Sequence, residues 1–146
     1  PNQQVSSNSM LEKWSGGSPA PGYPYAFRYY RTEKLIAATC YNGTDADGIA
    51  ADVNPDTWVR VETIFDWPNS SSKMYVNGVL ASTGSLTITG NITNSSLLYL
   101  ARRGGDPYNY SYYCKMKMPT FSIYNRALTQ SEIQQNFNAL RGRYGV

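Results

Sequence analysis

The stretch that decides the fold is residues 57–82, TWVRVETIFDWPNSSSKMYVNGVLAS. Its first half alternates, so that five side chains at every second position would share one face of a strand: Val59, Val61, Thr63, Phe65 and Trp67. Its second half, residues 73–76, meets Asn77-Gly78, a dipeptide that accepts the two positive φ angles of a type I′ hairpin turn. The stretch therefore predicts an antiparallel meander, which needs a second apolar layer to cover it.

Further strand-like segments lie on both sides of this meander. The alternating or continuous apolar runs span residues 10–14, 23–30, 35–41, 48–53, 85–89, 97–101 and 115–124. The continuous runs 35–41 and 97–101 are typical of buried strands, whereas Pro119 in the last run indicates a bulge or an edge strand. Many short strands separated by polar turns predict an all-β, jelly-roll-like double sheet.

One segment near the C-terminus predicts a helix. Thr129 and Glu132 have the spacing of a capping box, in which the hydroxyl of the first residue and the carboxylate of the second each accept from the other's amide. Ile133 and Phe137 follow at helical spacing, and Gly142 is predicted to end the helix. We therefore expect one amphipathic helix laid on the sandwich.

Length and composition fit one globular domain. The chain has 146 residues, of which 41% are hydrophobic and 16% charged, and no apolar run approaches the roughly 20 residues that a membrane-spanning helix needs. Its net charge of +3 is scattered rather than gathered in a dense basic patch, so we expect no nucleic-acid partner and no membrane insertion. The chain begins with Pro rather than Met, which indicates a processed or truncated piece.

The acidic residues and the absence of histidine argue against an enzyme. Without histidine the chain lacks the commonest general base and the usual serine or cysteine triads. Glu62 and Asp66 would share one face of a strand, but four residues along a strand span ~13 Å, which exceeds both glycosidase geometries. We therefore expect no catalytic residues.

Acidic residues gather in the loop that follows residue 44. Asp45, Asp47 and Asp52 offer hard oxygen ligands of the kind that Ca²⁺ takes, although the closing glutamate of an EF-hand is missing. The other reading is an ordinary polar turn in which aspartates cap backbone amides, and this reading is favoured. Calcium is therefore the one cofactor that the sequence leaves open.

Cys40 and Cys114 lie far apart in the sequence and allow two readings. Either they form one disulfide in an oxidising compartment, or they are free thiols buried like small apolar residues. Because C-x-x-C spacing is absent, the sequence favours free thiols.

Thirteen tyrosines are the most unusual feature of the composition. The binding candidates form two groups in the sequence: Tyr108, Tyr110, Tyr112 and Tyr113 near Arg102 and Arg103, and Trp14 with Tyr23 and Tyr25. Exposed aromatic rings give rigid contact area for a protein interface or for a stacked sugar. The alternative is that the rings pack into the sandwich with their hydroxyl groups at the rim. For the loop that contains Tyr108, an interface is favoured.

Four segments together resemble one superfamily. They are WVRVETIFD at 58–66, KMYVNGVL at 73–80, LYLARR at 98–103 and FSIYNRALTQSEI at 121–133. This combination resembles the concanavalin A-like lectin/glucanase superfamily, and more narrowly its laminin-G-like, pentraxin-like branch. The resemblance implies a single antiparallel β-sandwich domain over residues 1–146 with one short C-terminal helix.

The closing segment, IQQNFNALRGRYG at residues 133–145, is similar to the end of such domains in virion proteins of tailed bacteriophages. This resemblance implies a non-enzymatic virion protein that decorates or cements a capsid or forms part of a tail or fibre. Its partners would be other virion subunits or further copies of itself. The alternative is a carbohydrate-binding adhesion module of a phage fibre or bacterial surface protein, which would be secreted or held at the cell surface and bind glycans.

Domains of this family usually begin with additional strands ahead of the segment that residues 10–14 match, and these strands are missing here. The chain is then the C-terminal part of a longer protein, or another chain completes the sandwich. We expect a neighbouring subunit to fill the gap, because an unfilled slot would expose a long strand edge and native proteins cover such edges.

Overall fold

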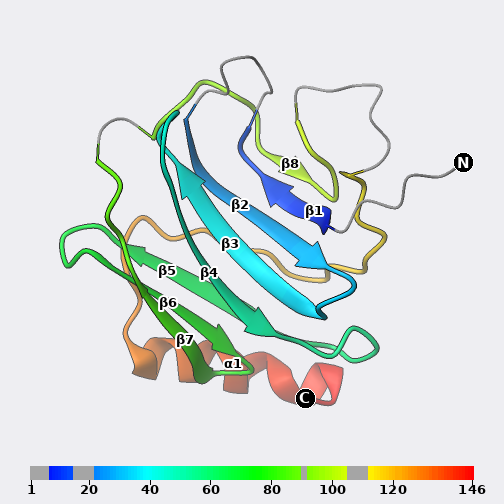
Figure 1. Cartoon of the computed structure of the whole chain (residues 1–146). Helices are drawn as coiled ribbons and strands as arrows, with labels where there is room; N and C mark the ends of the chain where they lie inside the picture. Colours follow the sequence, from blue (N-terminus) through cyan, green and yellow to red (C-terminus); the bar gives the residue numbers. More distant parts are fainter. Residues whose placement is uncertain (1–6, 15–21, 90–91, 105–111) are drawn as a thin grey trace, which may run out of the picture.

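The computed structural model describes residues 7–14, 22–89, 92–104 and 112–146. These residues form two antiparallel sheets and one helix at the C-terminal end (Figure 1). The predicted all-β sandwich with a C-terminal helix is therefore confirmed.

The larger sheet has five strands in the order β4-β3-β2-β1-β8. They are β1 (Ser7–Glu12), β2 (Tyr23–Tyr30), β3 (Leu35–Tyr41), β4 (Ala46–Asp52) and β8 (Tyr99–Leu100). Buried and half-buried residues alternate along β3, because both of its edges are paired and one of its faces covers the core. The strands predicted at 23–30 and 35–41 are confirmed to the residue, and the edge strand predicted at 48–53 corresponds to β4.

The smaller sheet is the predicted meander, in the order β5-β6-β7. It consists of β5 (Val61–Asp66), β6 (Ser71–Val76) and β7 (Val79–Ser85). Asn77 has φ 51° and Gly78 has φ 77°, so both central residues of the turn lie in the left-handed region that this dipeptide favours. The turn sets Val76 opposite Val79, which confirms the predicted hairpin.

The core lies where the two sheets overlap. Met74 on β6 is fully buried against Ala38 of β3 and Ile49 of β4. Val61 and Phe65 of β5 pack against the same cluster, which confirms that they share one face of their strand. Burial of a large apolar side chain contributes roughly 1.5–3 kcal/mol, so this overlap is the main source of stability.

Of two further predicted strands, the one at 85–89 does not form as a separate strand and the one at 97–101 is shorter than predicted. Residues 86–89 continue from β7 without strand pairing, although Leu86 and Ile88 are buried against Cys40. The buried strand predicted at 97–101 shrinks to the two residues of β8, and Leu97 is 71% exposed. The apolar run at 97–101 therefore marks the edge of the sheet rather than its interior.

The strand predicted at 115–124 is also wrong. These residues form no strand, and Phe121 and Ile123 are exposed. An alternating pattern shows that a segment can form a strand, but a strand also needs a neighbour for its backbone groups. No described strand pairs with this segment.

The helix α1 (Gln130–Tyr144) begins with the predicted capping box. The Thr129 hydroxyl accepts from the Glu132 amide at 3.3 Å, and the Glu132 carboxylate accepts from the Thr129 amide at 2.8 Å. Ile133 and Phe137 are buried, and the helix lies along the end of the smaller sheet (Figure 1). Among the described residues, no helix has the length and apolar character needed to cross a membrane.

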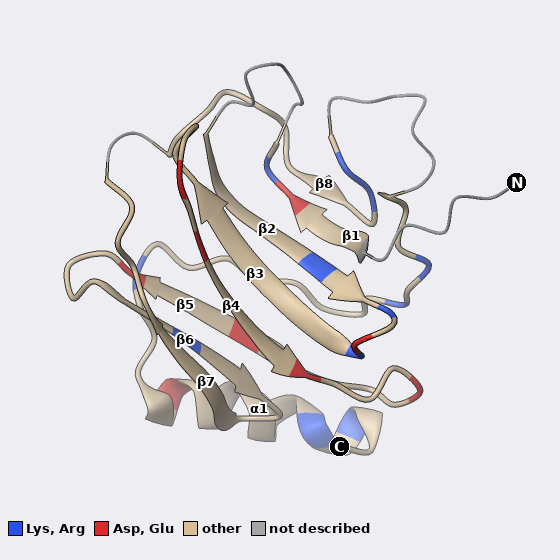
Figure 2. Cartoon of the chain, viewed as in Figure 1, with Lys and Arg blue, Asp and Glu red and all other residues tan. Residues whose placement is uncertain are grey.

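The helix ends later than the sequence predicts. Gly142 lies inside it, and Gly145, with φ 70°, is the C-cap whose amide donates to the Arg141 carbonyl. Arg141 and Arg143 occupy the last turn, where cations stabilise the negative end of the helix dipole (Figure 2). The prediction of Gly142 as the cap is therefore wrong, because a second glycine three positions later supplies the left-handed conformation.

Substitution of Gly78 by alanine is expected to destabilise the fold. The new Cβ would lie 3.0 Å from Cδ1 of Phe137, in a backbone conformation that costs an L-residue about 1–2 kcal/mol. The free energy of unfolding in urea should fall by about 2 kcal/mol. Gly142→Ala is the control, because nothing lies within 4 Å of its new Cβ and alanine stabilises a helix interior by about 0.5–1 kcal/mol. Equal stability of the two variants would contradict this role of the turn.

Candidate functional site

Glu12 carries a fully buried carboxylate at the end of β1. It accepts hydrogen bonds from Arg28 Nε at 2.6 Å, from Arg103 Nε at 3.2 Å and from the Ser9 hydroxyl at 2.7 Å. Figure 2 shows the acidic position on β1 beside the basic position on β2. These bonds join three segments: β1, β2 and the segment that follows β8.

The two arginines are nearly as buried as the carboxylate that they contact. Arg28 and Arg103 expose only 18% and 16% of their side chains. Burial by itself would lower the pKa of Arg28, but the charge and hydrogen bond of Glu12 raise that pKa above its ordinary value. Arg28 is therefore ionised. The buried ion pairs are stable only while Glu12 and both arginines are present.

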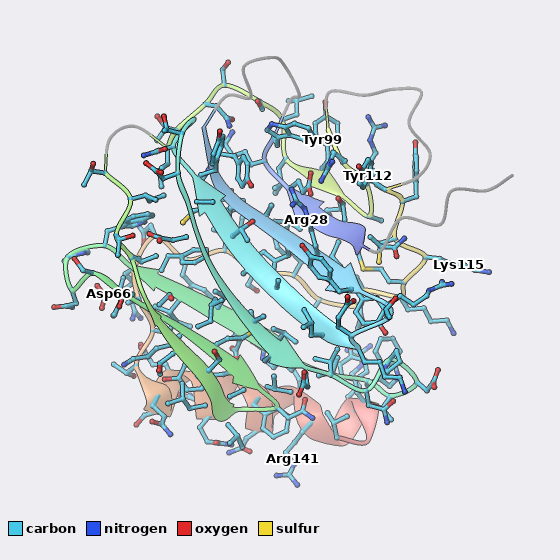
Figure 3. All side chains as sticks on the ribbon, viewed as in Figure 1. Arg28, Asp66, Tyr99, Tyr112, Lys115 and Arg141 are labelled. Carbon is cyan, nitrogen blue, oxygen red and sulfur yellow. The ribbon has the colours of Figure 1, made fainter. Side chains whose placement is uncertain are left out.

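Aromatic rings contact both arginines of the segment after β8. The guanidinium carbon of Arg103 lies 3.8 Å from the centre of the Tyr112 ring and 4.8 Å from that of Trp14. Arg102 lies over the Tyr99 ring at 4.7 Å. Each such cation–π contact is worth roughly 0.5–2 kcal/mol. We call these five residues the aromatic–arginine cluster; Figure 3 labels Tyr99 and Tyr112 within it.

The backbone around the cluster leaves no spare room. The Ala101 amide donates to a carbonyl of β1 at 2.8 Å, and the Cys114 amide donates to the Ala101 carbonyl at 2.9 Å. Gly104 is buried, and a Cβ there would overlap the Trp14 carbonyl oxygen and the Tyr99 ring. A glycine is therefore required where the chain passes the cluster.

Exposed apolar side chains lie next to the cluster in the sequence. Leu97, Leu98 and Leu100 expose 71%, 37% and 46% of their surface, and Tyr113 exposes 42%. Tyr113 is held against β1 by a bridge to Ser9. We call the three leucines and Tyr113 the β8 face. Tyrosine and arginine beside exposed apolar residues are typical of the centre of a protein interface.

The structure brings together residues from both groups of predicted binding candidates. Arg103 and Tyr112 belong to the first group, whereas Trp14 belongs to the second, and Arg103 contacts both rings. Arg102 lies beside them on Tyr99. A binding surface built from these residues remains a prediction, but their proximity is now established.

Other predicted candidates lie elsewhere. Tyr23 stacks on Tyr41, with 5.5 Å between ring centres, on the β2–β3 pair. Tyr25 lines a groove on the inner face of the larger sheet, where burial raises its pKa. The predictions for Tyr108 and Tyr110 fall outside the described residues.

Sequence reasoning missed Glu12 and Tyr99. Glu12 stands 16 and 91 positions from its two arginines, so no local spacing marks the ion pairs. Tyr99 lies inside an apolar run that we interpreted as a buried strand. The available signal was the Arg102-Arg103 pair directly after that run, because guanidinium groups at a sheet edge need a carboxylate or an aromatic ring.

The three predicted calcium ligands do not come together. Asp45 precedes β4 and Asp52 ends it, so roughly 20 Å of extended strand separates them. Asp47 accepts from the Thr87 hydroxyl at 2.9 Å and from the Ile88 amide at 2.8 Å. Desolvation would raise the pKa of Asp47, but these bonds lower it below its ordinary value. Among the described residues, no group of three or more acidic, cysteine or histidine side chains could hold a metal.

Cys40 and Cys114 are free thiols in the structure, so the disulfide reading is wrong. Cys40 is fully buried on β3, where desolvation and then the charge of Asp47 raise its pKa to about 11. Cys114 is half-buried, and desolvation raises its pKa too. Both thiols therefore behave as small apolar side chains.

Comparisons with known proteins identify one family. The family model Laminin_G_3, described as concanavalin A-like lectin/glucanases superfamily, matches residues 2–134. Among solved structures, the chain is similar to an S-layer domain-containing protein (residues 221–444) from Clostridium thermocellum, with 16% sequence identity and a TM-score of 0.39. That similarity covers 94% of this chain and 65% of the other chain. No curated protein matches the sequence.

Loss of the Glu12 charge is expected to destabilise the chain strongly. In Glu12→Gln, Arg28 and Arg103 would stay buried without their counter-charge, which costs about 3–5 kcal/mol in comparable ion pairs. Urea unfolding followed by circular dichroism measures this loss. Glu33→Gln, in the exposed turn between β2 and β3, is the control and should change stability by less than about 0.5 kcal/mol. Similar losses in the two variants would contradict a structural ion pair.

The two thiols should react slowly in the folded chain. The thiolate is the reactive form of cysteine, and both pKa values are raised. Iodoacetamide at about pH 8 should therefore leave Cys40 unmodified in the native protein and label both cysteines after denaturation without reductant. Intact-mass spectrometry counts the labels. Complete labelling of native Cys40 would show that β3 opens to solvent.

Proposed function

Because the chain belongs to the concanavalin A-like lectin/glucanase superfamily, we propose that it is a non-enzymatic structural module that makes protein–protein contacts in an assembled particle. The observation that carries this proposal is the β8 face, whose three exposed leucines and Tyr113 lie next in the sequence to residues of the aromatic–arginine cluster. Apolar surface that is exposed in the isolated chain gains free energy when a partner removes it from water.

Side-chain contacts hold the aromatic–arginine cluster together in the isolated chain. Glu12 fixes Arg103 by an ion pair, and Arg103 in turn contacts the rings of Trp14 and Tyr112. A surface that is already ordered loses less conformational entropy on binding. Preorganisation of this kind favours a contact surface over a mobile catalytic loop.

Two of the glutamates each pair with an arginine, which supports a role without catalysis. Glu62 pairs with Arg60 at 2.8 Å. Hydrogen bonds from Arg126, and then from Thr129, lower the pKa of Glu132 to about 2. A carboxyl group that stays ionised in this way cannot serve as a general acid near neutral pH.

The particle that we propose is the virion of a tailed bacteriophage, as a capsid decoration or a component of the tail or a fibre. The support is the similarity of residues 133–145 to the closing segments of such virion proteins. These residues form most of α1, which caps the hairpin turn at Gly78 through Phe137.

Carbohydrate binding is the second candidate. Tyr113 is 42% exposed and offers an aromatic side chain for stacking on a sugar, and Arg102 of the cluster could donate to hydroxyl groups. One face of the Tyr112 ring and one of the Trp14 ring already contact Arg103, which leaves less aromatic surface for a sugar. For this reason protein contact is preferred.

Self-association of the purified chain tests the proposal. Sedimentation equilibrium should show concentration-dependent association, and the double variant Leu97→Ser/Leu100→Ser should weaken it at least tenfold, because two exposed side chains leave the contact. Val79→Ser is the control: it removes a side chain that is 66% exposed at the β6–β7 turn, and it should associate like the unchanged chain.

Two results would overturn protein contact at this face. One is association that the double variant and the control affect equally. The other is a chain that stays monomeric at every concentration and binds a glycan array, with binding lost in Tyr113→Ala; that result would establish the second candidate.

A further inference from the structure

The two sheets differ in width, which leaves part of the larger sheet without a facing strand among the residues that the structure describes. The larger sheet has five strands and the smaller has three. Contacts between the sheets involve β4 with β6 and β7, so the smaller sheet lies under the β4 side (Figure 1). Each strand covers only ~4.8 Å of sheet width, and the inner faces of β1 and β2 therefore extend beyond the edge at β5.

An open groove of about 1640 Å³ lies along this uncovered part. The larger sheet, residues 53–68 with β5, the segment of residues 114–128 and the helix α1 all contribute to its walls. We call it the β5 groove; the apolar residues that line it include Tyr25, Phe27, Val61, Phe65, Met118 and Phe121. An apolar groove of this size beside a sheet is a place where a further chain segment can bury side chains.

The edge of β5 offers backbone hydrogen bonds to such a segment. The amide and carbonyl of Arg60 both bond Asn77, at 2.9 Å each, so they point toward β6. Backbone groups alternate in direction along an antiparallel strand, so those of Val61, Thr63 and Phe65 point away from β6. No described strand pairs with β5 on that side.

Side-chain atoms on β5 and on Arg60 just before it also lack partners. Buried polar side-chain atoms without a hydrogen bond include Arg60 Nε, Glu62 Oε2 and Thr63 Oγ1, and the described residues contain six such atoms in all. Half of them are therefore on four consecutive residues at this edge. A buried polar atom without a hydrogen-bond partner destabilises the fold, so a segment that satisfies these atoms is stabilised there.

Charge indicates the chemistry of the occupant. Among the described residues that line the groove, seven are arginine or lysine and three are aspartate or glutamate. Lys115 and Lys117 belong to the segment that forms one wall. A second copy of this chain would bring the same basic, alternating segment, so like charges disfavour it as the occupant.

We propose that the β5 groove binds an extended segment of a different protein, in which apolar residues alternate with acidic ones. The segment adds as a strand to the free edge of β5, places its apolar side chains against Tyr25 and Phe27, and directs its carboxylates toward the lysines of residues 114–128. This surface is separate from the β8 face, so the two proposals stand or fall independently.

A designed peptide tests the groove. The probe is a fluorescein-labelled ten-residue peptide in which valine and glutamate alternate, titrated with the full chain and followed by fluorescence anisotropy. The control peptide has the same composition with all valines before all glutamates. We expect the alternating peptide to bind at least tenfold more tightly, because only alternation puts the two kinds of side chain on opposite faces of a strand.

Matched variants locate the binding. Phe121→Ser removes a groove residue that is 44% exposed and should weaken binding at least fivefold, whereas Leu80→Ser removes a residue on β7 that is 42% exposed and lies outside the groove. Hydrogen exchange should slow at the outward amides of Val61, Thr63 and Phe65 when the alternating peptide is bound.

Three results would overturn the proposal. They are equal binding of the two peptides, equal effects of the two variants, and bound peptide that leaves exchange at β5 unchanged. Any of them leaves the self-association of the β8 face untouched, since that property is measured on the chain without peptide.

Discussion

The buried ion pairs of Glu12 join β1, β2 and the segment that follows β8. A single carboxylate accepts from Arg28 of β2 and from Arg103 after β8, so it joins strands that are distant in the sequence. Because Arg103 also contacts the rings of Trp14 and Tyr112, the position of the aromatic rings follows from the position of one acid. The charges are costly to bury, and this cost is recovered only in the complete arrangement. The aromatic–arginine cluster is therefore a consequence of the sheet's own packing.

The opposite face of the larger sheet is stabilised by hydrophobic burial instead of ion pairs. There the core depends on overlap with the smaller sheet, and Met74 marks the region where both layers are present. Beyond β5 no described strand continues the second layer, while aromatic residues such as Tyr25 continue along the inner face. One face of the sheet is thus closed by charge and aromatic contacts, and the other is only partly closed by hydrophobic burial. The β8 face lies next to the region closed by charge and aromatic contacts, and the β5 groove lies where hydrophobic burial is incomplete.

Sequence patterns predicted the elements whose cause is local. The Asn77-Gly78 turn and the Thr129 capping box were found because their residues are neighbours in the chain. Pairings across the fold were not found. Alternation in 115–124 shows a capacity for strand formation, but pairing depends on a neighbour that the pattern does not contain. The predicted calcium site did not form for a similar reason. Asp45 and Asp52 are near each other in the sequence, but the residues between them form an extended strand that separates the two side chains.

Lys115 and Lys117 have a further consequence for the behaviour of the chain in solution. They lie at the start of an exposed segment that contains Met118, Phe121 and Ile123, beside the edge of β5 with which no described strand pairs. An apolar edge of this kind is a site for aggregation, and flanking lysines act as gatekeepers because they repel a second copy approaching in the same orientation. Their repulsion is screened as ionic strength rises. The solubility of the chain is thus tied to salt through two residues that take no part in its folding core.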